Sequence, residues 1–180
     1  MTLAENTRNA GPAEVQEKAE ESQYLTFTVR KEMFAIDILF IKEILEYGQL
    51  TTVPMMPSFI RGVINLRGSV VPVVDLAARF GGNISEVSKR TCIVIIEVNT
   101  DGSRQDIGVV VDAVSEVLEI PYTEIEAAPS FGAKIRADFI QSMGKINGKF
   151  VIILDVDKVL SIDELSMLSQ NKLSSKLDSQ

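Results

Sequence analysis

Residues 59–76, FIRGVINLRGSVVPVVDL, decide the fold of this 180-residue chain. Two apolar runs rich in β-branched residues, at 63–66 and 70–74, lie on either side of Arg67-Gly68. Glycine readily adopts the positive φ of a tight hairpin, so this pattern predicts two antiparallel strands joined by a short turn. Asp75 ends the second run and predicts the N-cap of a short helix. The chain around this hairpin is therefore expected to be mainly β.

The features of this hairpin recur in the same order later in the chain. The matches are Phe59-Ile60 with Phe139-Ile140, Gly68 with Gly148 and Asp75 with Asp155, all 80 positions apart, and IKEILE (41–46) with VSEVLE (114–119), 73 positions apart. We interpret them as an internal repeat. About nine or ten strands, five in each unit, predict two small barrels that close their own edges. Chance likeness between apolar strands is the alternative explanation.

The folded part of the chain is expected to span residues 24–168 as a single domain, with its two units at about 24–90 and 91–160. Residues 1–23 contain five Glu and no aromatic residue. They have little to bury and are predicted to form a disordered acidic tail. A last, C-terminal helix is expected from about Ser161, and the polar residues 169–180 are predicted to be a flexible C-terminus.

Composition excludes several classes of function. The formal net charge of −7 would repel a phosphate backbone, so nucleic acid is not an expected partner. Histidine is absent, which removes Ser-His and Cys-His nucleophile pairs and histidine metal ligands. Asp155-Val156-Asp157 begins like a calcium loop, but Leu160 and Ser166 stand where that loop needs Gly and Glu. We expect no catalytic residues, no metal and no cofactor.

The sequence also predicts the cellular compartment of the protein. The single cysteine, Cys92, lies in an apolar run and is predicted to be a small buried side chain, which fits a reducing, cytoplasmic compartment. The first residues lack the apolar segment of a secretion signal, and no apolar run approaches the roughly 18 residues of a membrane span. Neither export nor direct membrane insertion is expected.

The stretch 59–76 resembles, almost position for position, the signature F-I-x-G-x-x-N-L-R-G-x-[VI]-V-P-[VI]-x-D-L of the CheW chemotaxis coupling proteins. The likeness covers about residues 22–168 and includes Ile36-Asp37-Ile38, the strand at 108–112 and Ala128-Pro129-Ser130-Phe131. This resemblance implies two five-stranded SH3-like barrels packed on a shared apolar core. It also implies a non-enzymatic cytoplasmic adaptor, recruited to membrane receptor arrays, that connects methyl-accepting chemotaxis receptors to the regulatory domain of the chemotaxis histidine kinase.

The resemblance also assigns roles to single residues. The receptor-binding residues it implies are Arg67, Glu43, Ile41, Gly62, Val114 and Gly108. For the kinase it implies Phe131, and Glu126 stands nearby where a basic residue often occurs. Arg67 and Glu43 are expected to form a partly exposed ion pair beside the receptor-binding groove. The alternative, on general grounds, is that Arg67 is a solvated charge and that Ile41, Val114 and the glycines are core or turn positions. Phe131 follows a proline in a polar connection and is expected to be exposed.

Two other functions remain open from the sequence. The first is a scaffold of the same fold in a related chemosensory pathway, such as one that serves pili or another output. The second is a carboxylate-dependent hydrolase, which would need a cleft with two close acids, one of strongly raised pKa.

Overall fold

The structure is a computed structural model, and it describes residues 21–100, 102–128 and 135–161. Residues 1–20, the expected C-terminus 169–180 and Phe131 lie outside this part of the chain, and so does the predicted last helix. Glu21, Ser22 and Gln23 pair with another strand, so the prediction of a tail over residues 1–23 was wrong for these three residues.

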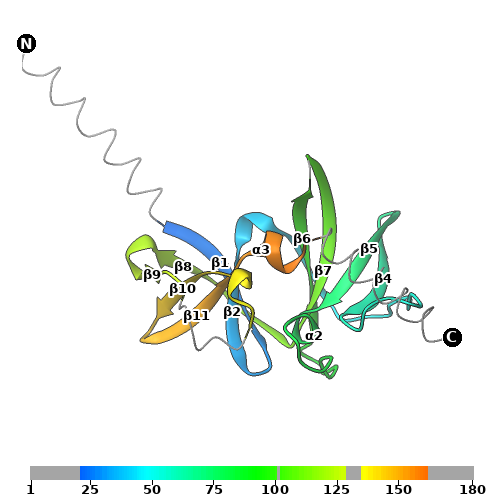
Figure 1. The fold of residues 1–180 in the computed structure, drawn as a ribbon, viewed down its shortest axis with the longest axis horizontal. Coiled ribbons are helices and arrows are strands. Elements are labelled where there is room, and N and C mark those ends of the chain that lie inside the picture. The colour runs from blue at the N-terminus through cyan, green and yellow to red at the C-terminus, as the bar shows by residue number, and fades with distance from the viewer. Residues whose placement is uncertain (1–20, 101, 129–134, 162–180) are drawn as a thin grey trace, which may run out of the picture.

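The chain forms two β-sheets that pack side by side (Figure 1). The first has six strands, in the order β8 (Ala113–Pro121), β1 (Glu21–Val29), β2 (Glu32–Asp37), β11 (Lys149–Leu154), β10 (Ile140–Ile146) and β9 (Ile125–Glu126). The second has five, in the order β3 (Ile41–Glu46), β6 (Cys92–Thr100), β7 (Ser103–Val111), β5 (Ser69–Asp75) and β4 (Ile60–Leu66). The predicted mainly β class is confirmed. The prediction of two closed five-stranded barrels was wrong in detail, because one sheet has six strands and both sheets keep edge strands.

Short helices complete the described chain. They are η1 (Ile38–Phe40), α2 (Leu76–Arg79), η2 (Tyr122–Glu124), η3 (Ala137–Phe139) and α3 (Val156–Val159). Asp75 accepts a hydrogen bond from the backbone N–H of Ala78, and Asp155 accepts one from that of Lys158. Both predicted N-caps are confirmed, because each carboxylate satisfies a backbone N–H that the first helical turn leaves free. No helix of the described residues is long and apolar enough to cross a membrane.

The internal repeat appears in the strand pairing. β5 runs parallel to β7 with Val73 opposite Gly108, and β11 runs parallel to β2 with Ile153 opposite Ala35. Val73 and Ile153 are 80 positions apart, and Ala35 and Gly108 are 73 apart, so both sheets use the same register. The sequence repeat is therefore a structural repeat.

The two units do not each form their own sheet, so the predicted boundary near residue 90 does not separate the sheets. After the β1–β2 hairpin the chain turns through η1 and begins β3 in the other sheet, and after β7 it crosses back at Asp112 to begin β8. The Asp37 carboxylate accepts from the N–H of Leu39 at 2.9 Å and stabilises the first crossing. Each sheet thus combines the hairpin of one unit with the later strands of the other, which local sequence patterns do not specify.

Buried side chains form three apolar clusters. The largest includes Phe27, Phe34 and Val109 and lies between the two sheets. Tyr24 and Ile153 belong to a second cluster, on the face of the six-stranded sheet that points away from the shared cluster. The third cluster lies on the corresponding face of the five-stranded sheet. Burying a large apolar side chain contributes about 1.5–3 kcal/mol, so the shared cluster is a major source of stability. The predicted shared apolar core is confirmed.

Candidate partner-binding site

The predicted ion pair between Arg67 and Glu43 is present. Arg67 and Gly68 have φ of 49° and 86°, which is the left-handed conformation of both central residues in a type I′ hairpin turn. Asn65 stabilises this turn by accepting the N–H of Gly68 on its side-chain oxygen at 3.0 Å. Arg67 donates from Nη1 to Glu43 Oε2 at 2.8 Å, and its side chain is 80% exposed. The pair joins the β4–β5 turn to β3, across the gap between the two edges of the five-stranded sheet.

Gly62 allows the segment after β3 to pair with β4, next to the same turn. Its φ is 150°, and a Cβ at this position would lie 2.4 Å from the carbonyl oxygen of Thr51. The missing side chain allows Thr51 and Val63 to exchange two backbone hydrogen bonds of 2.9 Å each. Gly62 is buried, so the structure places it as a residue that brings the segment after β3 onto β4.

Gly108 lies inside the five-stranded sheet. A Cβ on this buried residue would lie 2.8 Å from Cγ2 of Ile93 and 3.3 Å from Cγ2 of Val73. The glycine therefore allows close packing on the face of the sheet that carries the third apolar cluster, and it presents no side chain to a partner.

Ile41 and Val114 occupy equivalent positions in the two units, at the start of β3 and near the start of β8. Both are half-buried against the shared core. Leu39, which the sequence analysis did not single out, precedes Ile41 on η1 and is 87% exposed. Leu39 therefore adds an exposed apolar side chain at the crossing between the sheets, close in the chain to the half-buried Ile41. Apolar residues alternate at Phe34, Ile36 and Ile38. This pattern is typical of a strand and gives no sign of the helical turn that exposes Leu39.

More charges lie on the five-stranded sheet beside the Arg67 turn. Lys42 pairs with Asp106 at 3.2 Å, and Arg104 pairs with Glu97 at 3.5 Å. These residues line a hollow of about 300 Å³ together with Val70, which is 69% exposed. An apolar residue inside a charged rim is the usual anatomy of a protein interface. No local sequence pattern indicates this rim, because its residues come from strands that are far apart along the chain.

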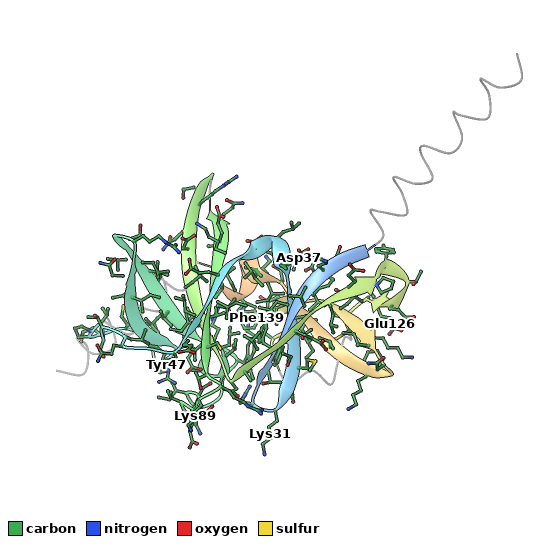
Figure 2. All side chains as sticks on the ribbon, turned by 180° about the vertical axis from the view of Figure 1, so that it is seen from behind. Lys31, Asp37, Tyr47, Lys89, Glu126 and Phe139 are labelled. Atoms are coloured by element: carbon green, nitrogen blue, oxygen red, sulfur yellow. The ribbon has the colours of Figure 1, made fainter. Side chains whose placement is uncertain are left out.

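Glu126 lies on the other sheet. It is exposed on the edge strand β9, where it pairs with Met143 of β10. Figure 2 shows Glu126 and Tyr47, which follows β3, on opposite sides of the molecule. The structure therefore separates the Arg67–Glu43 site from Glu126, and Phe131 falls outside the described residues.

Within the described part of the chain, Asp75 and Asp138 do not have the features of a hydrolytic pair. Asp75 is fully buried and accepts hydrogen bonds from Arg61 Nε at 2.8 Å and from Ser85 N at 3.0 Å, so its carboxylate serves to hold local structure. The side-chain hydrogen bond from Arg136 lowers the pKa of Asp138, which is the opposite of what a general acid requires. Among the described residues, no group of three or more Cys, Asp or Glu side chains is placed to hold a metal ion.

Fold and site together define a binding scaffold, in which two packed β-sheets present ion pairs and exposed apolar side chains. A family model described as CheW-like domain matches residues 23–164. The chain therefore belongs to the CheW family of chemotaxis proteins, which are non-enzymatic scaffolds.

Comparisons with individual proteins support the same family. The chain is 33% identical over 162 residues to the chemotaxis protein CheW of Klebsiella aerogenes, covering 88% of this chain and 95% of that protein. It is 32% identical to the chemotaxis protein CheW of Helicobacter pylori, covering 89% and 95%. The crystal structure of the scaffolding protein TtCheW from Thermoanaerobacter tengcongensis superposes with a TM-score of 0.71 at 33% identity, covering 78% of this chain and 93% of that one.

Proposed function

We propose that this protein couples methyl-accepting chemotaxis receptors to the regulatory domain of the chemotaxis histidine kinase at membrane receptor arrays in the cytoplasm. The observation that carries the proposal is the Arg67–Glu43 ion pair, held across the open side of the five-stranded sheet next to the exposed Val70. A charged pair with an apolar neighbour suits a protein partner, because the charges give specificity and the apolar side chain gives affinity.

In this proposal the receptor tip binds at the Arg67–Glu43 site. Ile41, Val114 and the exposed Leu39 supply apolar contacts to it, where the chain crosses between the sheets. Gly62 and Gly108 act indirectly, because they shape the five-stranded sheet that carries Arg67 and Glu43. The kinase binds the six-stranded sheet through Glu126 and Phe131. The separation of Glu126 from the five-stranded sheet supports this division, because two large partners then have room to bind together (Figure 2).

The proposal is tested by reconstitution. The purified protein is titrated into receptor-containing membranes with the kinase, and kinase autophosphorylation is measured. We expect the rate to rise with the protein and to reach a plateau. A constant rate over the whole titration, with both partners shown to be active by themselves, would contradict the proposal.

The second candidate is the same scaffold role in a pathway with another output, such as pili, for which the fold and the site would be the same. Co-purification from cells, followed by identification of the retained kinase and receptors, separates the two.

A further inference from the structure

Arg79 joins the two sheets through their helices. It is the last residue of α2, which follows β5 of the five-stranded sheet, and it is only 8% exposed. Its Nε donates to the carbonyl oxygen of Val159 at 2.8 Å. Val159 is the last residue of α3, which follows β11 of the six-stranded sheet. A carbonyl at a helix end has no partner within its helix, so the guanidinium supplies the missing hydrogen bond.

The same guanidinium stacks on an aromatic ring from each unit. Its central carbon lies 5.3 Å from the ring centroid of Phe59 and 4.8 Å from that of Phe139. Phe59 precedes β4 of the five-stranded sheet, and Phe139 precedes β10 of the six-stranded sheet. Phe139 lies in the middle of the molecule (Figure 2). A planar guanidinium makes such stacked contacts in a fixed geometry, which lysine does not reproduce.

Arg79 is also a point at which the two units differ. Phe59 and Phe139 are equivalent, 80 positions apart, and so are Arg79 and Val159. The apolar contacts between the sheets are non-directional and fix their mutual rotation only through packing. The hydrogen bond of Arg79 is directional, and it runs from one unit to the equivalent residue of the other.

We propose that Arg79 is a positioning residue for signal coupling, which holds the two sheets in the one mutual orientation that presents both partner faces together. The inference rests on the proposed function, in which each sheet binds a different partner. Loosening this contact leaves each face intact but changes the geometry between them.

The orientation is tested in the isolated protein, without either partner. Spin labels are placed at Gln105 on β7 and Thr123 in η2, both exposed, in a chain carrying Cys92→Ala. We expect Arg79→Met, which keeps much of the side-chain length, to broaden or shift the distance distribution between the labels. Arg79→Lys keeps a donor and a charge and should give a smaller change. A distribution identical to wild type in a folded Arg79→Met protein would overturn the inference.

Arg136→Met is the matched control. Arg136 also stacks on Phe139, at 4.5 Å, but it pairs with Asp138 of its own unit at 2.6 Å. This variant should keep the wild-type distance distribution. The same broadening in the control would overturn the specific role of Arg79, because any lost contact with Phe139 would then have this effect.

The coupling role has its own readout. In reconstituted membranes, Arg79→Met should lower receptor-dependent kinase activation about tenfold, while binding of the receptor alone and of the kinase alone stays unchanged. Partial recovery with Arg79→Lys would support positioning over a merely structural role. A changed distance distribution with normal coupling would overturn the signalling role of Arg79. If the wild-type protein does not couple at all, the proposed function fails, and the spin-label result still decides whether Arg79 orients the sheets.

Discussion

At the scale of single residues, the Arg67–Glu43 ion pair gives the sharpest test of the receptor site. A partly exposed pair contributes only about 0–1 kcal/mol to folding. Arg67→Glu should therefore leave the melting curve and kinase binding nearly unchanged and abolish receptor binding, as measured by sedimentation with receptor-containing membranes.

Arg30 provides the control for Arg67. It occupies the same position of the β1–β2 hairpin turn, with φ of 51° against 49° for Arg67. Arg30→Glu should retain receptor binding. Wild-type receptor binding by Arg67→Glu would refute the site. In the double variant Arg67→Glu with Glu43→Arg, recovered binding would mean that the pair only shapes the surface, and continued failure would mean that Arg67 contacts the receptor.

Tyr24 gives a pH-dependent prediction. Burial raises the pKa of its phenol above the ordinary 10.0, the Ser22 hydrogen bond opposes this, and nearby Asp37 adds to it. The folded protein therefore favours the neutral phenol more than the unfolded chain does. The resulting stability is complete below the unfolded pKa and is lost as the pH rises through the folded pKa.

Tyr24→Phe cannot ionise, so its free energy of unfolding should fall less steeply with pH than that of the wild type above about pH 10. Urea unfolding followed by circular dichroism from about pH 8 to pH 11 measures the two slopes. Equal slopes in the two proteins would show that ionisation of Tyr24 is not linked to folding.

At the scale of secondary-structure elements, Gly62 lets the chain after β3 reach β4. Gly62→Ala should lower the free energy of unfolding by about 2–4 kcal/mol, because it adds a steric overlap with Thr51 to the cost of a positive φ. Gly148→Ala is the control, since its φ is 78° but a Cβ there would meet nothing within 4 Å. It should cost only about 1 kcal/mol. Equal losses in denaturant titrations would mean that the close approach to Thr51 does not matter.

The two helix caps, although equivalent in sequence, differ in their surroundings. Asp75 is fully buried and pairs with Arg61, whereas Asp155 is half-buried and caps α3. Asp75→Ala leaves a buried charge without its partner and should cost about 3–5 kcal/mol. Asp155→Ala removes a cap and should cost about 0.5–2 kcal/mol. Calorimetry of both variants tests this order, and a larger loss for Asp155→Ala would contradict it.

At the scale of the whole molecule, the pairing of residues 21–23 with β8 makes these three residues part of the six-stranded sheet. A chain shortened to residues 21–169 should unfold cooperatively, with a midpoint within about 10 °C of the full chain. A chain that begins at Thr28 lacks the buried Tyr24, Leu25 and Phe27, so its melting midpoint should fall by much more than about 10 °C. Non-cooperative melting of the 21–169 chain would show that an omitted segment belongs to the core.

The sequence by itself determined the mainly β class, the repeated unit, the hairpin turn at Arg67-Gly68 and the caps at Asp75 and Asp155. These features depend on residues close together in the chain, because turns, caps and strand alternation are local. The pairing of Arg67 with Glu43 came from the family resemblance, since no local pattern relates two residues on opposite edges of a sheet.

Tertiary structure alone decided how the units combine. The exchange of hairpins between the two sheets, the sixth strand β9 and the charged rim around Val70 all depend on contacts between distant segments. The stacking of Arg79 between Phe59 and Phe139 also depends on such contacts. The physical reason is that apolar and β-branched residues specify a strand and its buried face but not its neighbour. Neighbours are chosen by the packing of the whole core, which becomes defined only when both units fold together.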